Sequence, residues 1–332
     1  FISPAKFISN GLDVFILNFG TQIDYLKQVA FFFIMLPVKI GLQLSVSPYT
    51  WGFELTPFLI TAYFIIMMLF ASWCFIKFSK DAAVGVVLFS IFIYFGLTNM
   101  PWLPLIFIYG LIGYRIGGFK LSLTIIASFM FITFTGVLPQ ALLSIYLCGI
   151  AVIISFILGA SLGIWAAHND KVSAFMRPIN DTMQTMPSFV ILIPFVMFFG
   201  IGEFTALLAI IAYAFVPAMR YTEHGLRNLP ETVIEAARMI GCSQAQLLWK
   251  VKIPLAMPVI MLGLNQTIMF GLAMLVIAAL VGTTGLGQLI YIGLSKADFG
   301  TGMISGVSIA LIAIIFDRTT QAWRIKLEKK TQ

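Results

Sequence analysis

Residues 220–257 have the sequence RYTEHGLRNLPETVIEAARMIGCSQAQLLWKVKIPLAM, and they separate two strongly apolar runs at 203–219 and 258–281. Runs of this kind fit the hydrocarbon core of a bilayer as α-helices, which satisfy their own backbone hydrogen bonds in lipid. The polar stretch between them cannot stay in that solvent. The sequence therefore predicts two membrane-spanning helices joined by a polar loop outside the bilayer.

The composition of the whole chain agrees with this local pattern. Hydrophobic residues make up 60% of the sequence and charged residues 10%, and the mean hydropathy is +1.01. So much apolar surface cannot be hidden inside a soluble domain of this length. The apolar runs are also too long and too continuous for the short alternating strands of a barrel. We expect an all-α polytopic membrane protein.

Nine apolar runs are candidate spans. They lie at 57–77, 82–98, 101–114, 119–136, 140–167, 187–201, 203–219, 258–281 and 302–316. A further stretch, 29–47, is interrupted by Pro37, Lys39 and Gln43, which favours a helix lying at the membrane interface over a tenth span.

The basic residues predict the orientation. With nine spans and the amino terminus outside, they gather in five segments on one side, namely 78–81, 115–118, 168–186, 220–257 and 317–332, together with flanking residues. The loops between spans on the other side contain a single basic residue, Lys296. By the positive-inside rule the five segments face the cytoplasm. The placed spans hold no charged residue near the midplane, which argues against an ion-coupled carrier.

The polar loop itself is patterned as a short amphipathic helix followed by a turn. Pro230 suits the first helical turn, Gly241 suits a left-handed cap, Ser243 can begin a second short helix, and Pro254 ends the segment. Apolar residues recur at i, i+3, i+4 and i+7, namely Val233, Ala236, Ala237 and Ile240. Such a short helix is marginal alone and calls for a partner surface. The alternative is a solvated helix resting on the membrane.

The same loop resembles a known family. Glu235-Ala236-Ala237, then Gly241, then Val251-Lys252-Ile253-Pro254 is similar to the Glu-Ala-Ala-x3-Gly-x9-Ile-x-Leu-Pro element of ATP-binding-cassette importer permeases. In that family the element is the coupling helix that inserts into the ATPase subunit. The resemblance implies the transmembrane domain of a type I ABC importer. It also implies ATPase-coupling roles for Glu235, Ala236, Ala237, Arg238, Gly241, Ile253 and Pro254.

Further blocks between about 140 and 323 resemble the permease subunit of glycine betaine/proline betaine importers. They are LGIWAA (162–167), MQTMP (183–187), PLAMP (254–258), NQT (265–267), GLGQ (285–288) and DRTTQA (317–322). The resemblance implies a permease for a small quaternary amine or zwitterionic osmolyte. Choline, carnitine or trimethylamine N-oxide are alternative substrates of the same machinery, and an ion-coupled secondary carrier is a further alternative.

The resemblance also implies an assembly. A second copy of this permease, cytoplasmic ABC ATPase subunits and an extracytoplasmic substrate-binding protein are the expected partners, in the inner or plasma membrane of a bacterium or archaeon. The chain lacks the Gly-x4-Gly-Lys-Ser/Thr pattern of a nucleotide-binding loop. ATP and Mg²⁺ are therefore expected in the ATPase, and we expect this chain to carry no cofactor, no metal and no catalytic set of its own.

These expectations divide the chain into four parts. Residues 1–56 form an amino-terminal segment with the interfacial helix, and 57–136 form peripheral transmembrane helices. Residues 137–323 form the permease core, with the coupling-helix loop at 220–257. Residues 324–332 are a cytoplasmic tail.

Three sets of residues are candidates for the transport path and its gate. Asn265 and Gln266 need polar partners in the membrane, so they either pack against another helix or line a water-filled path. Trp165, Tyr213 and Phe215 are candidates because quaternary ammonium groups are attracted to aromatic faces, although most rings of such a protein face lipid. Gly285, Leu286 and Gly287 lie in a glycine-rich loop that forms either an external gate or a plain connection.

Overall fold

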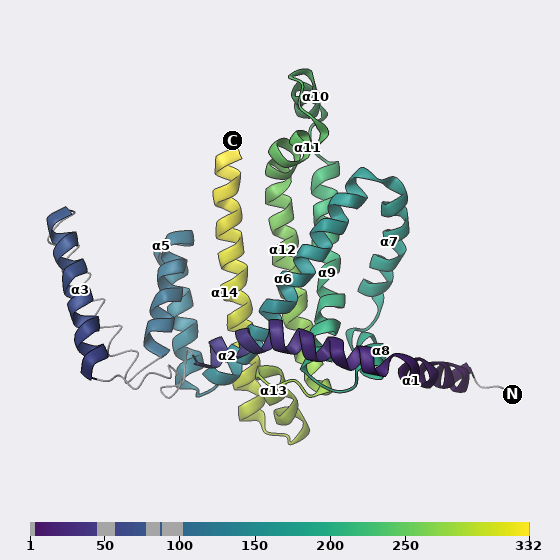
Figure 1. The fold of residues 1–332 in the computed structure, drawn as a ribbon, viewed down its shortest axis with the longest axis horizontal. Coiled ribbons are helices and arrows are strands. Elements are labelled where there is room, and N and C mark those ends of the chain that lie inside the picture. Colours follow the sequence, from purple (N-terminus) through teal and green to yellow (C-terminus); the bar gives the residue numbers. More distant parts are fainter. Residues whose placement is uncertain (1–3, 45–56, 78–86, 88–101, 332) are drawn as a thin grey trace.

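The computed structural model describes residues 4–44, 57–77, 87 and 102–331, and the described part is built from helices and connecting turns (Figure 1). The elements are α1 (Pro4–Ala30), the π-helix η1 (Phe31–Met35), α2 (Leu36–Leu44), α3 (Pro57–Lys77), α5 (Trp102–Phe134), α6 (Leu138–His168), α7 (Asp170–Thr185), α8 (Ser188–Phe199), α9 (Glu203–Arg227), α10 (Glu231–Met239), α11 (Gln244–Gln246), the π-helix η2 (Leu247–Lys252), α12 (Ile253–Ala278), the 3-10 helix η3 (Ala279–Val281), α13 (Leu286–Ser295) and α14 (Phe299–Thr331).

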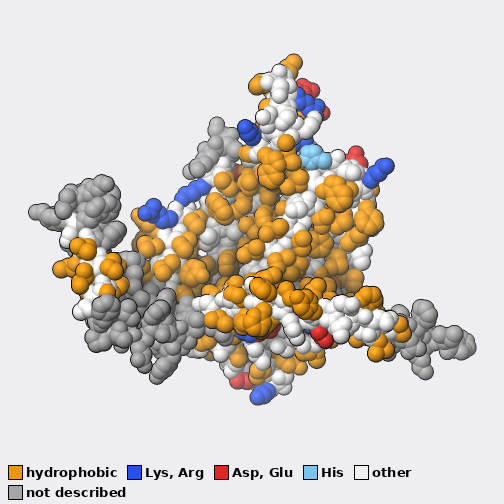
Figure 2. All heavy atoms as spheres, viewed as in Figure 1, with side chains coloured by type: hydrophobic (Ala, Val, Ile, Leu, Met, Phe, Trp, Pro, Cys, Tyr) orange, Lys and Arg blue, Asp and Glu red, His pale blue; other side chains and the backbone are white. Residues whose placement is uncertain are grey.

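The all-α polytopic prediction is confirmed. Within the described residues, six helical segments are long and apolar enough to cross a membrane, or seven if the bent pair α7 and α8 is one span. Figure 2 shows hydrophobic side chains over the middle of the bundle and Lys and Arg side chains near the end that carries α10. By the positive-inside rule this is the cytoplasmic end. The predicted span 82–98 lies almost wholly outside the described residues.

The centre of the bundle is the pair α6 and α9, which pack closely because α6 presents small residues. A Cβ on Gly159 would lie 2.6 Å from the carbonyl oxygen of Phe215, and a Cβ on Gly163 would lie 2.6 Å from that of Met219. One turn earlier, Ser155 Oγ donates to the carbonyl of Ile211 at 3.3 Å. This small-residue stripe at intervals of four lets the two backbones touch, as in many membrane helix pairs.

The predicted spans 101–114 and 119–136 both fall in α5, which doubles back on itself. Gly118 has non-helical angles, φ 76° and ψ −167°. Ser122 Oγ donates to the carbonyl of Gly110 at 2.8 Å, although residues twelve apart in a straight helix lie about 18 Å apart. The segment is therefore a hairpin of two short helices that turns at the glycine.

The prediction of a loop at 168–186 was wrong. Residues 168–186 are not a cytoplasmic loop, because 170–185 form α7, which runs back along α9 toward the opposite end of the bundle (Figure 1). The chain then bends by 104° into α8. A hydropathy scan misses α7 because its polar side chains pair with α9 instead of facing lipid. Ser173 Oγ, for example, donates to Glu223 at 2.6 Å.

The amino-terminal helix starts earlier than the predicted 29–47 and is helical from Pro4 to Leu44 through the π-turn η1. Figure 1 shows it running across the bundle near the end opposite α10, at a steep angle to the long helices. Many of its apolar side chains are exposed, including Leu17, Phe32 and Phe33. This orientation supports the interfacial placement, which stays a prediction because the segment is also long enough to span.

Candidate functional site

The polar loop forms the tip of the molecule. Figure 1 shows α10 and α11 projecting beyond the bundle at its cytoplasmic end. Glu235, Ala236 and Arg238 are exposed, and so are the apolar side chains at the end of this helix: Met239 is 90% exposed, and the capping residue Ile240 is 83% exposed. A short helix that presents large apolar groups on its outer side is suited to pack against a partner surface.

Gly241 permits the tight turn of the chain after α10. Gly241 has φ 86°, the left-handed conformation predicted for it, and its N–H donates to the carbonyl of Arg238 at 2.9 Å. The next N–H, of Cys242, donates to the carbonyl of Ala237 at 3.2 Å. Together these bonds satisfy carbonyls that the end of α10 would leave unpaired.

The second part of the loop is fixed to the bundle. Ser243 Oγ accepts from the N–H of Gln246, and Gln246 Oε1 accepts from the N–H of Ser243, which is the capping box at the start of α11. Pro254, predicted to end the segment where the next span begins, lies in the first turn of α12, which the helix enters through η2. The wide turns of η2 accommodate a residue that has no N–H to donate. Ile253 packs on the buried cluster of Leu226, Ala256 and Ile260.

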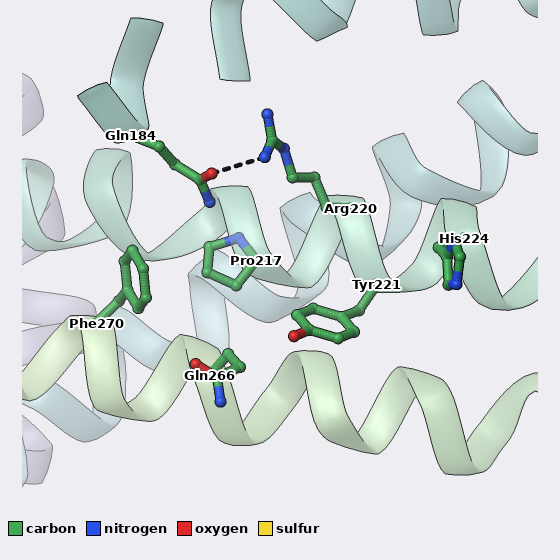
Figure 3. A pocket seen from close by; sticks show the side chains of 7 residues that line it. All are labelled: Gln184, Pro217, Arg220, Tyr221, His224, Gln266 and Phe270. Carbon is green, nitrogen blue, oxygen red and sulfur yellow. Dashed lines mark hydrogen bonds between the residues drawn. The ribbon is translucent and has the colours of Figure 1, made fainter. Parts of the chain in front are cut away.

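A cavity of about 450 Å³ lies between α7, α9 and α12. This volume is in the range of small-molecule sites. Figure 3 shows the side chains that line it, with Arg220 reaching toward Gln184 and with Tyr221 and Gln266 between α9 and α12. The lining residues are Gln184, Pro217, Arg220, Tyr221, His224, Gln266 and Phe270.

Arg220 is held from the α7 side. Its Nη1 donates to Gln184 Oε1 at 2.7 Å, and its Nη2 donates to Asp181 Oδ1. The Arg220 side chain remains 38% exposed and the Asp181 side chain 66% exposed. Arg220 lies seven residues before the end of α9, about 10 Å inside that helix. Arg220 directly follows the predicted span 203–219, and Asp181 lies in the segment predicted as a loop.

The structure separates the two predicted amides. Gln266 lines the cavity, whereas Asn265 points to α14. There Asn265 Nδ2 donates to Asp317 Oδ1 at 2.8 Å, and Thr320 Oγ1 donates to Asn265 Oδ1 at 2.8 Å. Asn265 is 7% exposed. Its surroundings are those of the packing alternative, and those of Gln266 fit the path-lining one.

The three predicted aromatic residues are also spread out. Tyr213 stacks obliquely on Phe270, which lines the cavity, with ring centroids 5.1 Å apart. Trp165 is 58% exposed on α6 and Phe215 is half-buried on α9, and neither lines the cavity. Tyr213 is thus one ring away from the candidate site.

The predicted gate residues form a tightly packed turn at the extracytoplasmic end. Gly285 has φ 128°, and a Cβ there would lie 2.6 Å from Ser144 Oγ. That hydroxyl accepts from the N–H of Leu286 at 2.8 Å, and the Leu286 side chain is fully buried. A Cβ on Gly287 would lie 3.0 Å from the carbonyl oxygen of Leu275. The glycines here permit close contact with α6 and α12.

Most of the cavity escaped the sequence analysis. Four of its residues on α9 follow the spacing i, i+3, i+4, i+7, and the other two helices add the remaining three. On α9 they are Pro217, Arg220, Tyr221 and His224. This periodicity was a usable signal, since it places a polar and aromatic stripe on one helical face. It was missed because residues from 220 onward were taken to lie outside the membrane.

Comparison with known proteins finds the same family from several directions. Residues 159–323 match the family model described as binding-protein-dependent transport system inner membrane component. The chain is 40% identical over 226 residues to the glycine betaine/proline betaine transport system permease protein ProW of Escherichia coli, covering 68% of this chain and 64% of that protein. It is 37% identical over 255 residues to the glycine betaine transport system permease protein OpuAB of Bacillus subtilis, covering 77% and 90%.

A solved structure shares the fold. The MetNI methionine ABC transporter, in an inward facing conformation, superimposes with a TM-score of 0.50 at 20% identity, covering 56% of this chain and 93% of the matched chain. The predicted type I ABC importer fold is confirmed. Together with the six apolar helices, the family match places the chain in the inner membrane as a multi-pass protein.

Proposed function

Because the chain belongs to the family of binding-protein-dependent transport system inner membrane components, whose members are non-enzymatic ABC permease subunits, we propose that it forms the translocation path of an ATP-driven importer for a small quaternary amine. Glycine betaine and proline betaine are the substrates that the ProW resemblance favours. Choline, carnitine and trimethylamine N-oxide are alternatives on the same machinery.

The observation that carries the proposal is the projecting α10. Its exposed Glu235 and Ala236 offer a small, flat contact, and Met239 and Ile240 need a surface to cover them. A cytoplasmic ABC ATPase holding ATP and Mg²⁺ would supply that surface. Work would then pass through Ile253, which ties the loop to the cluster on α9 and α12. Ligand-dependent closure of the ATPase acts by favouring one of two packed states of the bundle.

The remaining partners follow from the same role. A second copy of this chain would complete the path. An extracytoplasmic substrate-binding protein would deliver the solute at the end that carries the packed turn at residues 285–287, the glycine turn. The cavity beside Arg220 has the chemistry for a small zwitterion, since it combines a cation with the ring faces of Tyr221 and Phe270. Gln266, one of the predicted path residues, lines it as well.

Reconstitution tests the proposal. The permease is placed in proteoliposomes with its ATPase and binding protein, and uptake of labelled glycine betaine and ATP hydrolysis are measured together. We expect uptake only with all components, and we expect Glu235→Ala and Gly241→Leu to break the link between hydrolysis and uptake. The control is Asp24→Asn, an exposed acid on α1 near the other end. Coupled uptake by both loop variants would refute the coupling role.

Transport by the isolated chain would refute the wider proposal. An ion-coupled carrier needs no ATPase, so liposomes that contain only this chain and an ion gradient distinguish the two functions. We expect no uptake from them. The ion pair of Arg220 on α9 with Asp181 on α7 makes this control necessary, because charged groups between helices are what a secondary carrier uses.

A further inference from the structure

Arg220 has binding capacity that the protein does not use. A guanidinium offers five N–H donors arranged to match a carboxylate, and two bonds to side chains are formed here, to Gln184 and Asp181. The Arg220 side chain is 38% exposed and lines the cavity. Arg220 is the one residue of the Lys, Arg, Asp and Glu types among the described residues that line the cavity.

The resting partner of Arg220 is easy to displace. Asp181 lies on α7 outside the cavity lining and is 66% exposed. An exposed ion pair of this kind contributes little net stability, because water competes for both charges. A carboxylate entering the cavity can therefore replace Asp181 on the guanidinium while Gln184 keeps the arginine in place.

The rest of the cavity suits the other end of such a molecule. Tyr221 and Phe270 present aromatic rings, and ring faces attract quaternary ammonium groups. Tyr213 backs the ring of Phe270 and fixes its position. No acidic side chain is among the lining residues, so a ligand that carries only a positive charge would find no anionic partner there and would lie near the arginine. A zwitterion avoids this repulsion.

We infer that Arg220 binds the carboxylate of a zwitterionic solute in this cavity, with Asp181 as the counter-ion that the solute displaces. The inference rests on the proposed transport function and narrows it, because it favours betaines, which carry a carboxylate, over choline, which does not. It assigns Arg220 as a specificity-determining residue of the path.

The test separates this role from a structural one by using a ratio. Solute taken up per ATP hydrolysed is measured for glycine betaine in the complete reconstituted importer, so that differences in the amount of folded protein cancel. Arg220→Gln is expected to lower the ratio on the order of tenfold to a hundredfold, the range for a lost charge-assisted bond pair. Arg220→Lys keeps the charge and should recover part of it.

Arg227→Gln is the matched control. Arg227 also lies on α9 and pairs with carboxylates, Asp170 at 2.8 Å and Glu223 at 3.0 Å, but it does not line the cavity. We expect its ratio to equal that of the unchanged protein. An equal fall in Arg227→Gln and Arg220→Gln would overturn the inference, because it would show that any broken ion pair on α9 uncouples the importer.

Asp181→Asn should change the affinity for glycine betaine in the direction opposite to Arg220→Gln. Binding of tritiated glycine betaine to the purified permease–ATPase complex, without the binding protein, should weaken in Arg220→Gln and strengthen severalfold in Asp181→Asn, because the competitor for the guanidinium is gone. Weakening in both variants would mean that the ion pair is structural only. Failure of the unchanged protein to import glycine betaine would sink the proposed function itself, whereas normal import by Arg220→Gln would sink only this inference.

Discussion

Lys39 of α2 and Glu203 of α9 form an ion pair with 2.5 Å between Nζ and Oε1, although 164 residues separate them. Glu203 also accepts from Thr284 Oγ1 at 3.0 Å and from the hydroxyl of Tyr146 at 3.4 Å. This cluster joins the amino-terminal helix, α6, α9 and the loop before the glycine turn. Both charged side chains are largely buried, at 20% and 14% exposure. It therefore anchors the peripheral helix to the permease core.

Glu203→Gln should loosen this anchor. Removing one charge leaves Lys39 without its counter-ion in a partly buried place, at a cost of about 1–3 kcal/mol. Hydrogen exchange of α2 amides in nanodiscs should become faster, with α9 much less affected. Lys27→Gln is the control, since Lys27 pairs only locally with the exposed Asp24 at 3.4 Å. Unchanged exchange in Glu203→Gln would show that apolar contacts alone hold α2.

Because α6 and α9 are in close contact at Gly163, a larger side chain at this position should strongly destabilise the protein. In Gly163→Leu the new side chain would begin 2.6 Å from the Met219 carbonyl, so the helices must separate, at a cost of about 1–3 kcal/mol or more. Gly149→Leu lies on the same helix, where a Cβ meets nothing within 4 Å. Thermal unfolding in detergent should show a lower midpoint for the first variant only. Equal midpoints would mean that the helices do not meet at Gly163.

These residues show how far the sequence could be interpreted. Apolar runs of spanning length predicted α6, α9, α12 and α14, because the bilayer imposes length and composition on each helix separately. The turn at Gly241 was also predictable, since a left-handed residue after a short amphipathic helix is a local requirement. Features that depend on one helix or one turn alone, such as its length, its composition and its cap, can be predicted from a single sequence.

What could not be predicted depends on two elements meeting. The segment of α7 was predicted as a loop because it is polar, and the facing Arg220 of α9 explains why Asp181 and Gln184 lie against that helix. Asn265 and Gln266 are adjacent in sequence, and their separate surroundings follow from α14 and α9, which lie on different sides of α12. Pairing across helices carries information that hydropathy lacks.

Ser144 fixes the glycine turn, and its removal should destabilise that turn. Ser144→Ala leaves the buried N–H of Leu286 without its acceptor, which costs about 1–3 kcal/mol. We expect faster hydrogen exchange at 285–289 and a lower unfolding midpoint. Ser161→Ala is the control, because Ser161 is exposed on the same helix and bonds only to the carbonyl of Ile157. Equal effects of both variants would contradict a specific role of Ser144.

The start of α14 should depend on pH through Asp298. Hydrogen bonds from Thr301, first from its hydroxyl at 2.7 Å and then from its N–H at 3.2 Å, lower the pKa of the Asp298 carboxyl below its ordinary value. A lowered folded pKa means that the stabilisation is complete above the unfolded pKa and is lost as pH falls through the folded pKa. Hydrogen exchange of the first turn of α14 should therefore show no ionisation-linked change near neutrality and lose protection in acid.

Asp298→Asn is the check on that assignment. An amide still accepts a hydrogen bond but does not titrate, so the acid-dependent loss of protection at the first turn of α14 should vanish in this variant. The same loss in the variant would attribute it to another group.

Asn265 and Gln266 should respond to the same substitution in opposite ways. Asn265→Leu removes the amide that bonds to Asp317 and Thr320, so it should lower the unfolding midpoint. The coupling ratio, which is the amount of glycine betaine taken up per ATP hydrolysed, should stay close to normal. Gln266→Leu removes a half-buried amide from the cavity lining, so it should spare stability and change the ratio. Because stability and transport are measured on both variants, the pair acts as its own control. A loss of transport in a stable Asn265→Leu protein would put Asn265 back in the path, and the α12–α14 bond would then be a contact of one transport state only.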